Sequence, residues 1–129
     1  MKIDYSERAR ALVGTRFRLQ GRGTEGLDCV GLAVAAFQME AHSVPRNYRA
    51  RGDHEAAVRA FLCTDFRRVP ASQLRRGDLM LMRVAADQVH LGIRTHAGFV
   101  HADAGLKRVV EAPGMPAWPI SAVYRKRRG

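Results

Sequence analysis

The stretch from Asp28 to Met39 constrains the fold more than any other part of the sequence, because it is apolar nearly all round. Its apolar residues include Val30, Leu32, Val34, Ala35, Ala36, Phe37 and Met39. This pattern predicts a helix that is buried inside the protein rather than one that lies on its surface. Asp28 is a residue type that caps helix N-termini, which makes Cys29 the first helical residue. Pro45 is expected to mark the end of the helix.

Two further helices are expected in the first half of the chain. Ser6 predicts the N-cap of a short helix that ends at Gly14. Asp53 predicts the N-cap of another helix, which runs through Leu62. Residues 14–27 carry glycines among arginines, a composition typical of an irregular loop.

After Pro70 the sequence changes to short apolar runs separated by turn signals. These runs predict strands over residues 79–84, 89–95, 99–102, 108–112 and 120–125. Helices followed by a meander of strands predict an α+β protein, with N-terminal helices packed on a C-terminal antiparallel sheet. The 129 residues contain no internal repeat or linker, so we expect one domain over residues 1–129, since domains run to roughly 100–200 residues.

The chain is strongly basic: 22 Lys and Arg against 12 Asp and Glu give a formal net charge of +10. That charge leaves three classes of partner open, namely nucleic acid, an anionic surface and an anionic polymer. Residues 125–129 are interpreted as a basic, solvated tail. No apolar run approaches the ~20 residues of a membrane span. The first eight residues lack the apolar core of a secretory signal, so we expect cytoplasmic synthesis without a signal peptide.

The two cysteines lie in different contexts. Cys29, at the start of the buried helix and after a glycine-rich loop, is placed where the helix dipole and free N–H groups lower a thiol pKa. It is therefore a candidate nucleophile, although a lone cysteine also serves as a small buried hydrophobe. Cys63 lies in the apolar stretch Ala60-Phe61-Leu62-Cys63, where we expect only the structural role.

Two histidines on successive predicted strands are candidates for the base and its partner. His90 lies in Val89-His90-Leu91, and His101 in Val100-His101-Ala102. A hairpin turn over 96–98, centred near 95/96, brings these positions close together across the two strands. One imidazole can then accept the cysteine proton while the other fixes its tautomer.

A metal site is not expected, and neither is a cofactor. Cys29, His90, His96 and His101 are ligand types, but their spacings place no two ligands on one helix face. The sequence holds no Cys-x2-Cys pair and no His-Glu-x-x-His motif. We expect His96, in its turn, to be solvated, as well as His42 and His54 near the helix ends.

Taken in order, five segments resemble the NlpC/P60 family of cysteine peptidases. They are Val13-Gly14-Thr15-Arg16-Phe17, Leu27-Asp28-Cys29-Val30-Gly31-Leu32, Arg76-Gly77-Asp78-Leu79, His90-Leu91-Gly92-Ile93 and Phe99-Val100-His101-Ala102. The resemblance implies a papain-like α+β fold and cleavage of amide bonds in peptidoglycan stem peptides. It also implies that Cys29 is the nucleophile, His90 the base and His101 the orienting residue. The similarity is greatest to the phage-tail and gene-transfer-agent branch.

Three positions next to the nucleophile are candidate substrate-binding residues. Family members usually carry tyrosine where this chain has Phe17, and often serine where it has Val30. Phe17 cannot donate a hydrogen bond to an oxyanion, so the backbone N–H of Cys29 would carry more of that role. The carboxylate of Asp28 could meet a free amine of the substrate, although its capping role alone accounts for it.

Three functions remain open at this point. The first is a peptidoglycan endopeptidase associated with a phage tail or tail-like particle, which would act in the periplasm or cell wall. The second is an amidase or acyltransferase of the same fold, or a catalytically weak tail-assembly protein, which Phe17 and Val30 favour. The third is a basic module that binds nucleic acid; we do not expect it, because the chain has no zinc-finger, helix-turn-helix or RNP-type pattern.

Overall fold

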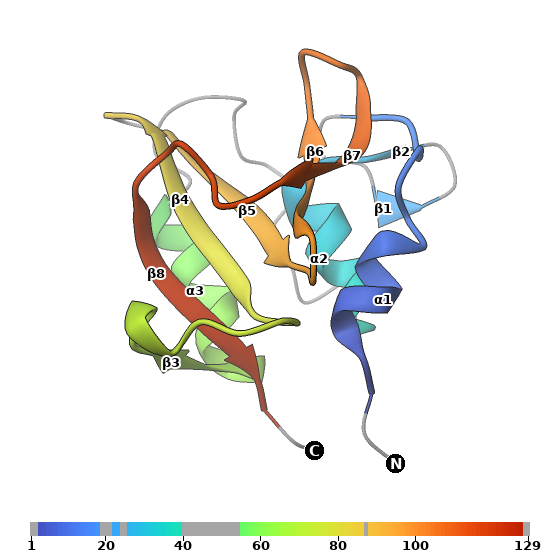
Figure 1. Cartoon of the computed structure of the whole chain (residues 1–129). Helices are drawn as coiled ribbons and strands as arrows, with labels where there is room; N and C mark the ends of the chain where they lie inside the picture. The colour runs from blue at the N-terminus through green and yellow to red at the C-terminus, as the bar shows by residue number, and fades with distance from the viewer. Residues whose placement is uncertain (1–2, 19–21, 24–25, 40–54, 87, 128–129) are drawn as a thin grey trace.

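The computed structural model describes residues 3–18, 22–23, 26–39, 55–86 and 88–127, and in this part of the chain the helices precede the main sheet (Figure 1). The elements are α1 (Tyr5–Arg10), β1 (Arg22–Gly23), β2 (Gly26–Leu27), α2 (Cys29–Phe37), α3 (Glu55–Asp65), β3 (Phe66–Val69), the 3-10 turn η2 (Ala71–Gln73), β4 (Leu79–Ala85), β5 (Gln88–Arg94), β6 (Gly98–Asp103), β7 (Arg108–Pro113) and β8 (Ile120–Lys126).

The main sheet has the strand order β3-β8-β4-β5-β6-β7, and every neighbouring pair is antiparallel. The expected α+β class with an antiparallel sheet is therefore confirmed. All five expected strands are present within one or two residues of the predicted bounds. Three features were not predicted: the strand β3, the 3-10 turn η2, and the small β1–β2 hairpin inside the stretch that we expected to be irregular.

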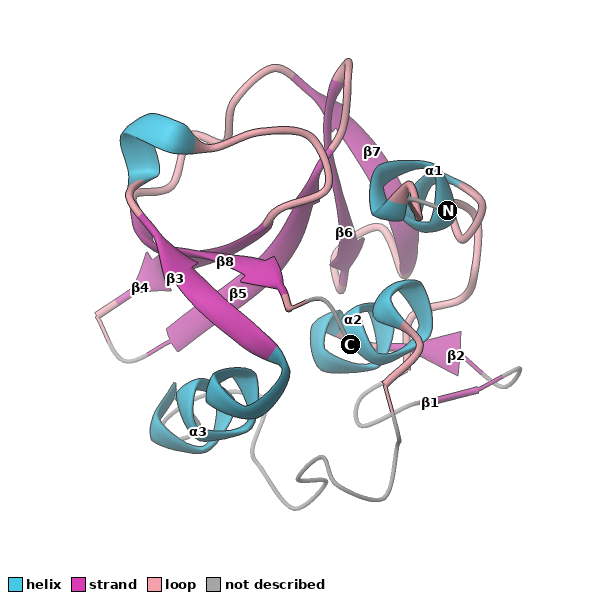
Figure 2. Cartoon of the chain, turned by 90° about the horizontal axis from the view of Figure 1, so that it is seen from below, coloured by secondary structure: helices cyan, strands magenta, loops and turns pink. Residues whose placement is uncertain are grey.

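The helix α2 lies at the centre of the molecule, between α1, the main sheet and the β1–β2 hairpin (Figure 2). Seven of its nine residues are buried, which confirms the buried helix. Its carbonyl groups at the C-terminal end are partly satisfied by Arg8 of α1, whose Nε donates to the oxygen of Ala36 at 2.8 Å. The helix ends at Phe37, earlier than predicted, because Gln38 adopts a left-handed conformation with φ of 55°. Pro45 lies outside the described residues.

The prediction for α1 was wrong in its cap and its length. Asp4, not Ser6, is the N-cap, and its carboxylate accepts a hydrogen bond from the N–H of Glu7 at 3.2 Å. Ser6 is buried and its hydroxyl donates to the same carboxylate. The helix ends at Arg10, and a turn follows as far as Gly14, which takes a φ of +96°.

Helix α3 is confirmed over Glu55–Asp65, but the burial that we expected for Cys63 was wrong. Val58 and Leu62 are buried, whereas Cys63 lies on the exposed side of the helix. The apolar stretch around Cys63 misled the prediction because only one stripe of this helix faces the core. Asp53, the expected cap, lies outside the described residues.

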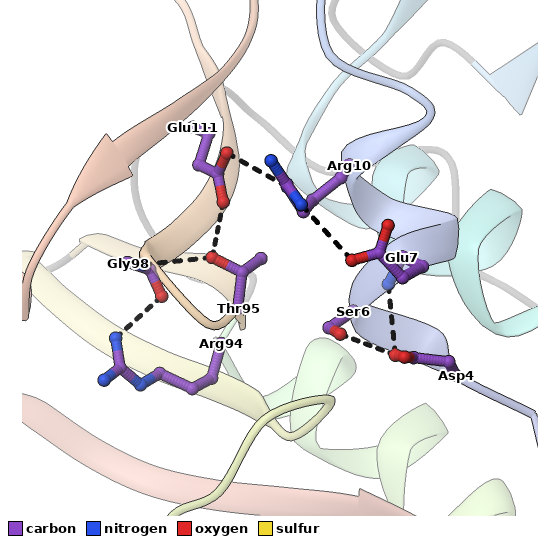
Figure 3. A network of polar contacts seen from close by, with 8 residues as sticks. All are labelled: Asp4, Ser6, Glu7, Arg10, Arg94, Thr95, Gly98 and Glu111. Carbon is purple, nitrogen blue, oxygen red and sulfur yellow. Dashed lines mark hydrogen bonds and ion pairs between the residues drawn. The ribbon is translucent and has the colours of Figure 1, made fainter.

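A polar network fastens α1 to the turn between β5 and β6 (Figure 3). Glu111 of β7 contacts Arg10 of α1 at 3.2 Å through one carboxylate oxygen, and accepts a hydrogen bond from Thr95 at 2.6 Å through the other. Thr95 in turn accepts a hydrogen bond from the N–H of Gly98 at 3.0 Å. The network therefore holds the hairpin that connects the two candidate histidines in a fixed position relative to α1.

Arg125 is not part of a solvated tail, which corrects that prediction. It belongs to β8, and its Nε and terminal nitrogen contact the two carboxylate oxygens of Asp78, each at 2.8 Å. Asp78 is only 2% exposed and also accepts a hydrogen bond from the N–H of Arg75 at 3.0 Å. This bidentate pair joins the turn before β4 to the last strand.

We predict that Asp78→Asn destabilises the protein by about 3 kcal/mol, because removing one charge of a buried pair leaves its partner uncompensated. Urea unfolding of the wild type and the variant measures the difference. Asp65→Asn is the matched control: no ion pair of Asp65 is found in the described part of the chain, so its free energy of unfolding should change by less than about 0.5 kcal/mol. Equal effects of the two substitutions would contradict the assigned role of the pair.

Candidate active site

Cys29 is the first residue of α2, as predicted, and it is half-buried against the main core. Asp28 immediately before it is the N-cap, and its carboxylate accepts a hydrogen bond from the N–H of Gly31 at 2.8 Å. This position exposes the thiol to the positive end of the helix dipole and to backbone N–H groups without helical partners. Both effects favour a thiolate over a thiol.

The chain that enters α2 is held by the segment around Phe17. Leu27 donates its N–H to the oxygen of Arg16 at 2.9 Å, and its own oxygen accepts from Arg18 at 3.1 Å. Gly26 has a φ of +138°, and a Cβ on it would lie 2.8 Å from the Arg16 oxygen. Glycine is therefore required here for the close approach of the two backbones. Phe17 is half-buried and packs against the main core.

His90 and His101 are in direct contact, as the sequence predicted. Nε2 of His90 lies 2.9 Å from Nδ1 of His101, and the two ring planes are 89° apart. The register differs from the expected one. The ladder pairs of β5 and β6 are Ile93 with Val100 and Arg94 with Phe99, which centres the hairpin one residue later. The histidines lie beyond these pairs and meet as diagonal neighbours through their side chains.

The environment of the two imidazoles favours their neutral forms. Burial, reinforced by the neighbouring His101, lowers the pKa of His90 to about 4, and Asp103 opposes this shift only in part. Burial also lowers the pKa of His101, again against the opposing charge of Asp103. A neutral His90 can both donate through one ring nitrogen and accept through the other, which a base oriented by a partner requires.

The helix that begins with Cys29 packs against β5 and β6, the two strands that carry His90 and His101. The three predicted catalytic residues therefore come from elements in direct contact. In the described part of the chain, no three His, Cys, Asp or Glu side chains gather in a group that could hold a metal ion. Among the same residues, no helix combines the length and apolar character needed to cross a membrane.

The candidate substrate-binding residues lie in different environments. Val30 has no exposed surface and is part of the main core, so its side chain offers no contact to a substrate in this conformation. Asp28 is 3% exposed. His96 is exposed in the hairpin turn, as expected, while His42 and His54 lie outside the described residues.

Trp118 is a neighbour of the histidine pair that the sequence analysis did not single out. Its ring centroid lies 5.7 Å from that of His90 and 5.8 Å from that of His101. No periodicity or motif points to this residue. The available signal was compositional: it is the one tryptophan in the sequence, and it lies between Pro116 and Pro119 in the turn before the last strand.

With this geometry established, comparison with known proteins is decisive. The model of the NlpC/P60 family matches residues 14–123, a span that contains Cys29, His90 and His101. The chain belongs to the NlpC/P60 family. Family membership agrees with the resemblance inferred from the five sequence segments; assignment to the phage-tail and gene-transfer-agent branch stays a prediction.

A curated relative of this NlpC/P60 chain is the Murein DD-endopeptidase MepS/Murein LD-carboxypeptidase of Escherichia coli strain K12. The two are 28% identical over 107 residues, which cover 81% of this chain and 51% of that protein. The same protein from two other Escherichia coli strains matches equally well. The chain thus spans about half the length of the curated relatives that it matches.

Solved structures show the NlpC/P60 fold. NlpC1 from Trichomonas vaginalis has a TM-score of 0.70 at 18% identity, over 97% of this chain and 44% of that one. The peptidoglycan hydrolase RipB from Mycobacterium tuberculosis has a TM-score of 0.59 at 24% identity, over 97% and 64%. The NlpC/p60 domain of peptidoglycan hydrolase SagA has a TM-score of 0.60 at 18% identity, over 85% and 86%. The expected fold is therefore confirmed.

We predict that His90 of this NlpC/P60 chain stays neutral in the folded protein down to about pH 5, because its pKa is about 4. NMR titration of the imidazole resonances measures the midpoint directly. An unfolded histidine titrates near pH 6.5, so the unfolded state binds more protons between about pH 4 and 6.5. Stability should therefore fall as the pH drops through this window. A His90 midpoint near 6.5 would contradict the prediction.

Proposed function

We propose that this protein is a cysteine peptidase that hydrolyses amide bonds in peptidoglycan stem peptides through Cys29, His90 and His101. The observation that carries the proposal is the 2.9 Å contact between Nε2 of His90 and Nδ1 of His101. This contact leaves Nδ1 of His90 available for proton exchange. Cys29 starts the helix that packs against both histidine strands, which supports the assignment of these residues as nucleophile, base and orienting group.

The proposal assigns a direction to the histidine contact, and with it the role of each ring. In the tautomer that the mechanism requires, Nε2–H of His90 donates to Nδ1 of His101, which places the His90 lone pair on Nδ1. That nitrogen takes the thiol proton of Cys29. The resulting imidazolium and thiolate stabilise each other, which offsets the low basicity that burial gives His90.

Hydrolysis then proceeds in two halves. The Cys29 thiolate attacks the amide carbonyl, a C–S bond forms, and the C–N bond breaks as His90 returns its proton to the leaving amine. Water, deprotonated by the now neutral His90, attacks the thioester and releases a carboxylic acid and the Cys29 thiol. The backbone N–H of Cys29, at the start of α2, is the donor best placed by position to stabilise the oxyanion, since Phe17 has no hydroxyl.

The substrate follows from the relatives and the charge. The Escherichia coli relative is named as a murein endopeptidase, and two structural neighbours are named as peptidoglycan hydrolases. A net charge of +10 attracts the chain to an anionic envelope, although salt screens this attraction. Association with a phage tail or tail-like particle, and action in the periplasm or cell wall after cytoplasmic synthesis, complete the proposal.

Phe17 supports one second candidate function. It is half-buried beside the segment that leads into Cys29, and it cannot supply the hydroxyl that family members usually have there. Losing an oxyanion donor costs about 2.7–4 kcal/mol of transition-state stabilisation in other enzymes. A related acyl chemistry, as in an amidase or acyltransferase, or a weakly active role in tail assembly, would tolerate that loss.

We predict that purified peptidoglycan digested by the wild type yields new stem-peptide fragments, and that Cys29→Ala lowers their rate of release by at least about 10³-fold. Mass spectrometry of the soluble products measures both. Cys63→Ala is the matched control, because Cys63 is an exposed cysteine on α3; its products and rate should equal those of the wild type.

Two outcomes would contradict the proposal. Fragment release by Cys29→Ala at the wild-type rate would remove Cys29 as nucleophile. Failure of the wild type to release any fragment from walls of several chemical types would favour the second candidate function.

A further inference from the structure

Two further aromatic rings, those of Phe99 and Trp118, contact the histidine pair. Phe99 stacks on His101 with a centroid distance of 5.0 Å and ring planes 28° apart. Trp118 lies nearly perpendicular to both imidazoles, with its plane 81° from each. Among the described residues, Trp118 is thus the one aromatic side chain that contacts both histidine rings.

The segment that carries Trp118 is fixed at both of its ends. Gly114 donates its N–H to the oxygen of Ala97 in the β5–β6 turn at 3.0 Å. The oxygen of Pro119 accepts a hydrogen bond from the N–H of Arg83 of β4 at 2.9 Å. Pro116 and Pro119 further restrict the backbone on either side of the tryptophan. The indole is therefore presented to the histidines by a segment with little freedom.

Strand β5, which carries His90, leaves space for the ring of Phe99 at Gly92. A Cβ on Gly92 would lie 2.9 Å from the terminal methyl of Met82 and 3.1 Å from the ring of Phe99. Met82 and Phe99, together with Met80, form a second apolar cluster. Glycine at position 92 leaves the space in which Phe99 reaches under His101.

We infer that Trp118 is a positioning residue of this site, which holds the His90 and His101 rings in the orientation that joins Nε2 to Nδ1. The inference rests on the proposed role of His90 as the base. An imidazole can rotate about its own side-chain bonds, and rotation of either ring would break a single hydrogen bond. Trp118 contacts both rings at once, so it restricts rotation of either ring out of this arrangement.

This positioning role requires an aromatic side chain at position 118. A planar aromatic ring can make edge-to-face contacts with two imidazoles at once, whereas a branched aliphatic side chain fills volume without this geometry. The indole is 36% exposed, so its removal opens no cavity in the main core. Trp118→Phe should therefore preserve the arrangement, and Trp118→Ala and Trp118→Leu should lose it while the protein stays folded.

The first readout is the tautomer of His90, measured by the ¹⁵N resonances of its ring, which requires no activity. We expect the Nε2–H form alone in the wild type and in Trp118→Phe, and a mixture of both tautomers in Trp118→Ala and Trp118→Leu. A single unchanged tautomer in Trp118→Ala would overturn the inference. Circular dichroism of each variant shows that the fold is retained.

The second readout is the kinetics of peptidoglycan-fragment release. Loss of orientation predicts a kcat about 10-fold lower in Trp118→Ala, with KM within about twofold of the wild type and rescue by Trp118→Phe. A higher KM with unchanged kcat would overturn the positioning role in favour of substrate contact. Failure of the proposed function can be distinguished from failure of this inference. Fragment release by Cys29→Ala would contradict the proposed function, whereas the tautomer of His90 is measured without any activity and would still test the role of Trp118.

Discussion

Burial of α2 is the constraint on which the rest of the structure depends. A nine-residue helix with seven buried residues must be surrounded, and here α1, the β1–β2 hairpin, β5 and β6 surround it. Its two ends are nevertheless satisfied by polar groups, Asp28 at the N-terminus and Arg8 at the C-terminus. The N-terminus is thereby fixed with Cys29 as its first residue. The position that the helix dipole makes favourable for a thiolate is a consequence of how the core is built.

The contact between His90 and His101 depends in turn on the position of the β5–β6 hairpin. The β5–β6 ladder pairs residues only near the turn, and the contact of His90 with His101 joins the strands further along. Arg10, Glu111 and Thr95 hold the turn itself to α1 (Figure 3). The rings of Phe99 and Trp118 contact the two imidazoles. A neutral imidazole pair, with His101 buried and His90 half-buried, is useful only if its orientation is maintained, because a half-satisfied polar contact away from water is costly.

Local patterns predicted most of the fold and the residues of the candidate site. The all-round apolar segment after Asp28 specified the buried helix, and turn signals specified each strand after Pro70. Patterns failed where tertiary contacts decided the outcome. The composition around Arg125 predicts a charged, solvated tail, yet Arg125 pairs with the buried Asp78, 47 residues away along the chain. The apolar stretch around Cys63 predicts burial, but Cys63 is exposed to solvent. Trp118 contacts the histidines from a turn, and a turn has no hydrophobic periodicity that could have predicted this contact.

The central claim is that Cys29 and His90 share a proton as a catalytic pair, with His101 as the orienting group. The pH dependence of Cys29 alkylation by iodoacetamide tests it most directly, with Cys63→Ala as the background so that one thiol reacts. The account predicts rapid alkylation of Cys29 between about pH 5 and 7 in this background, because the neutral His90 accepts the thiol proton as the sulfur attacks. When His90→Ala is added, alkylation over this range should become slow, as for an ordinary thiol with a pKa near 8.5. Identical pH profiles with and without His90 would contradict it.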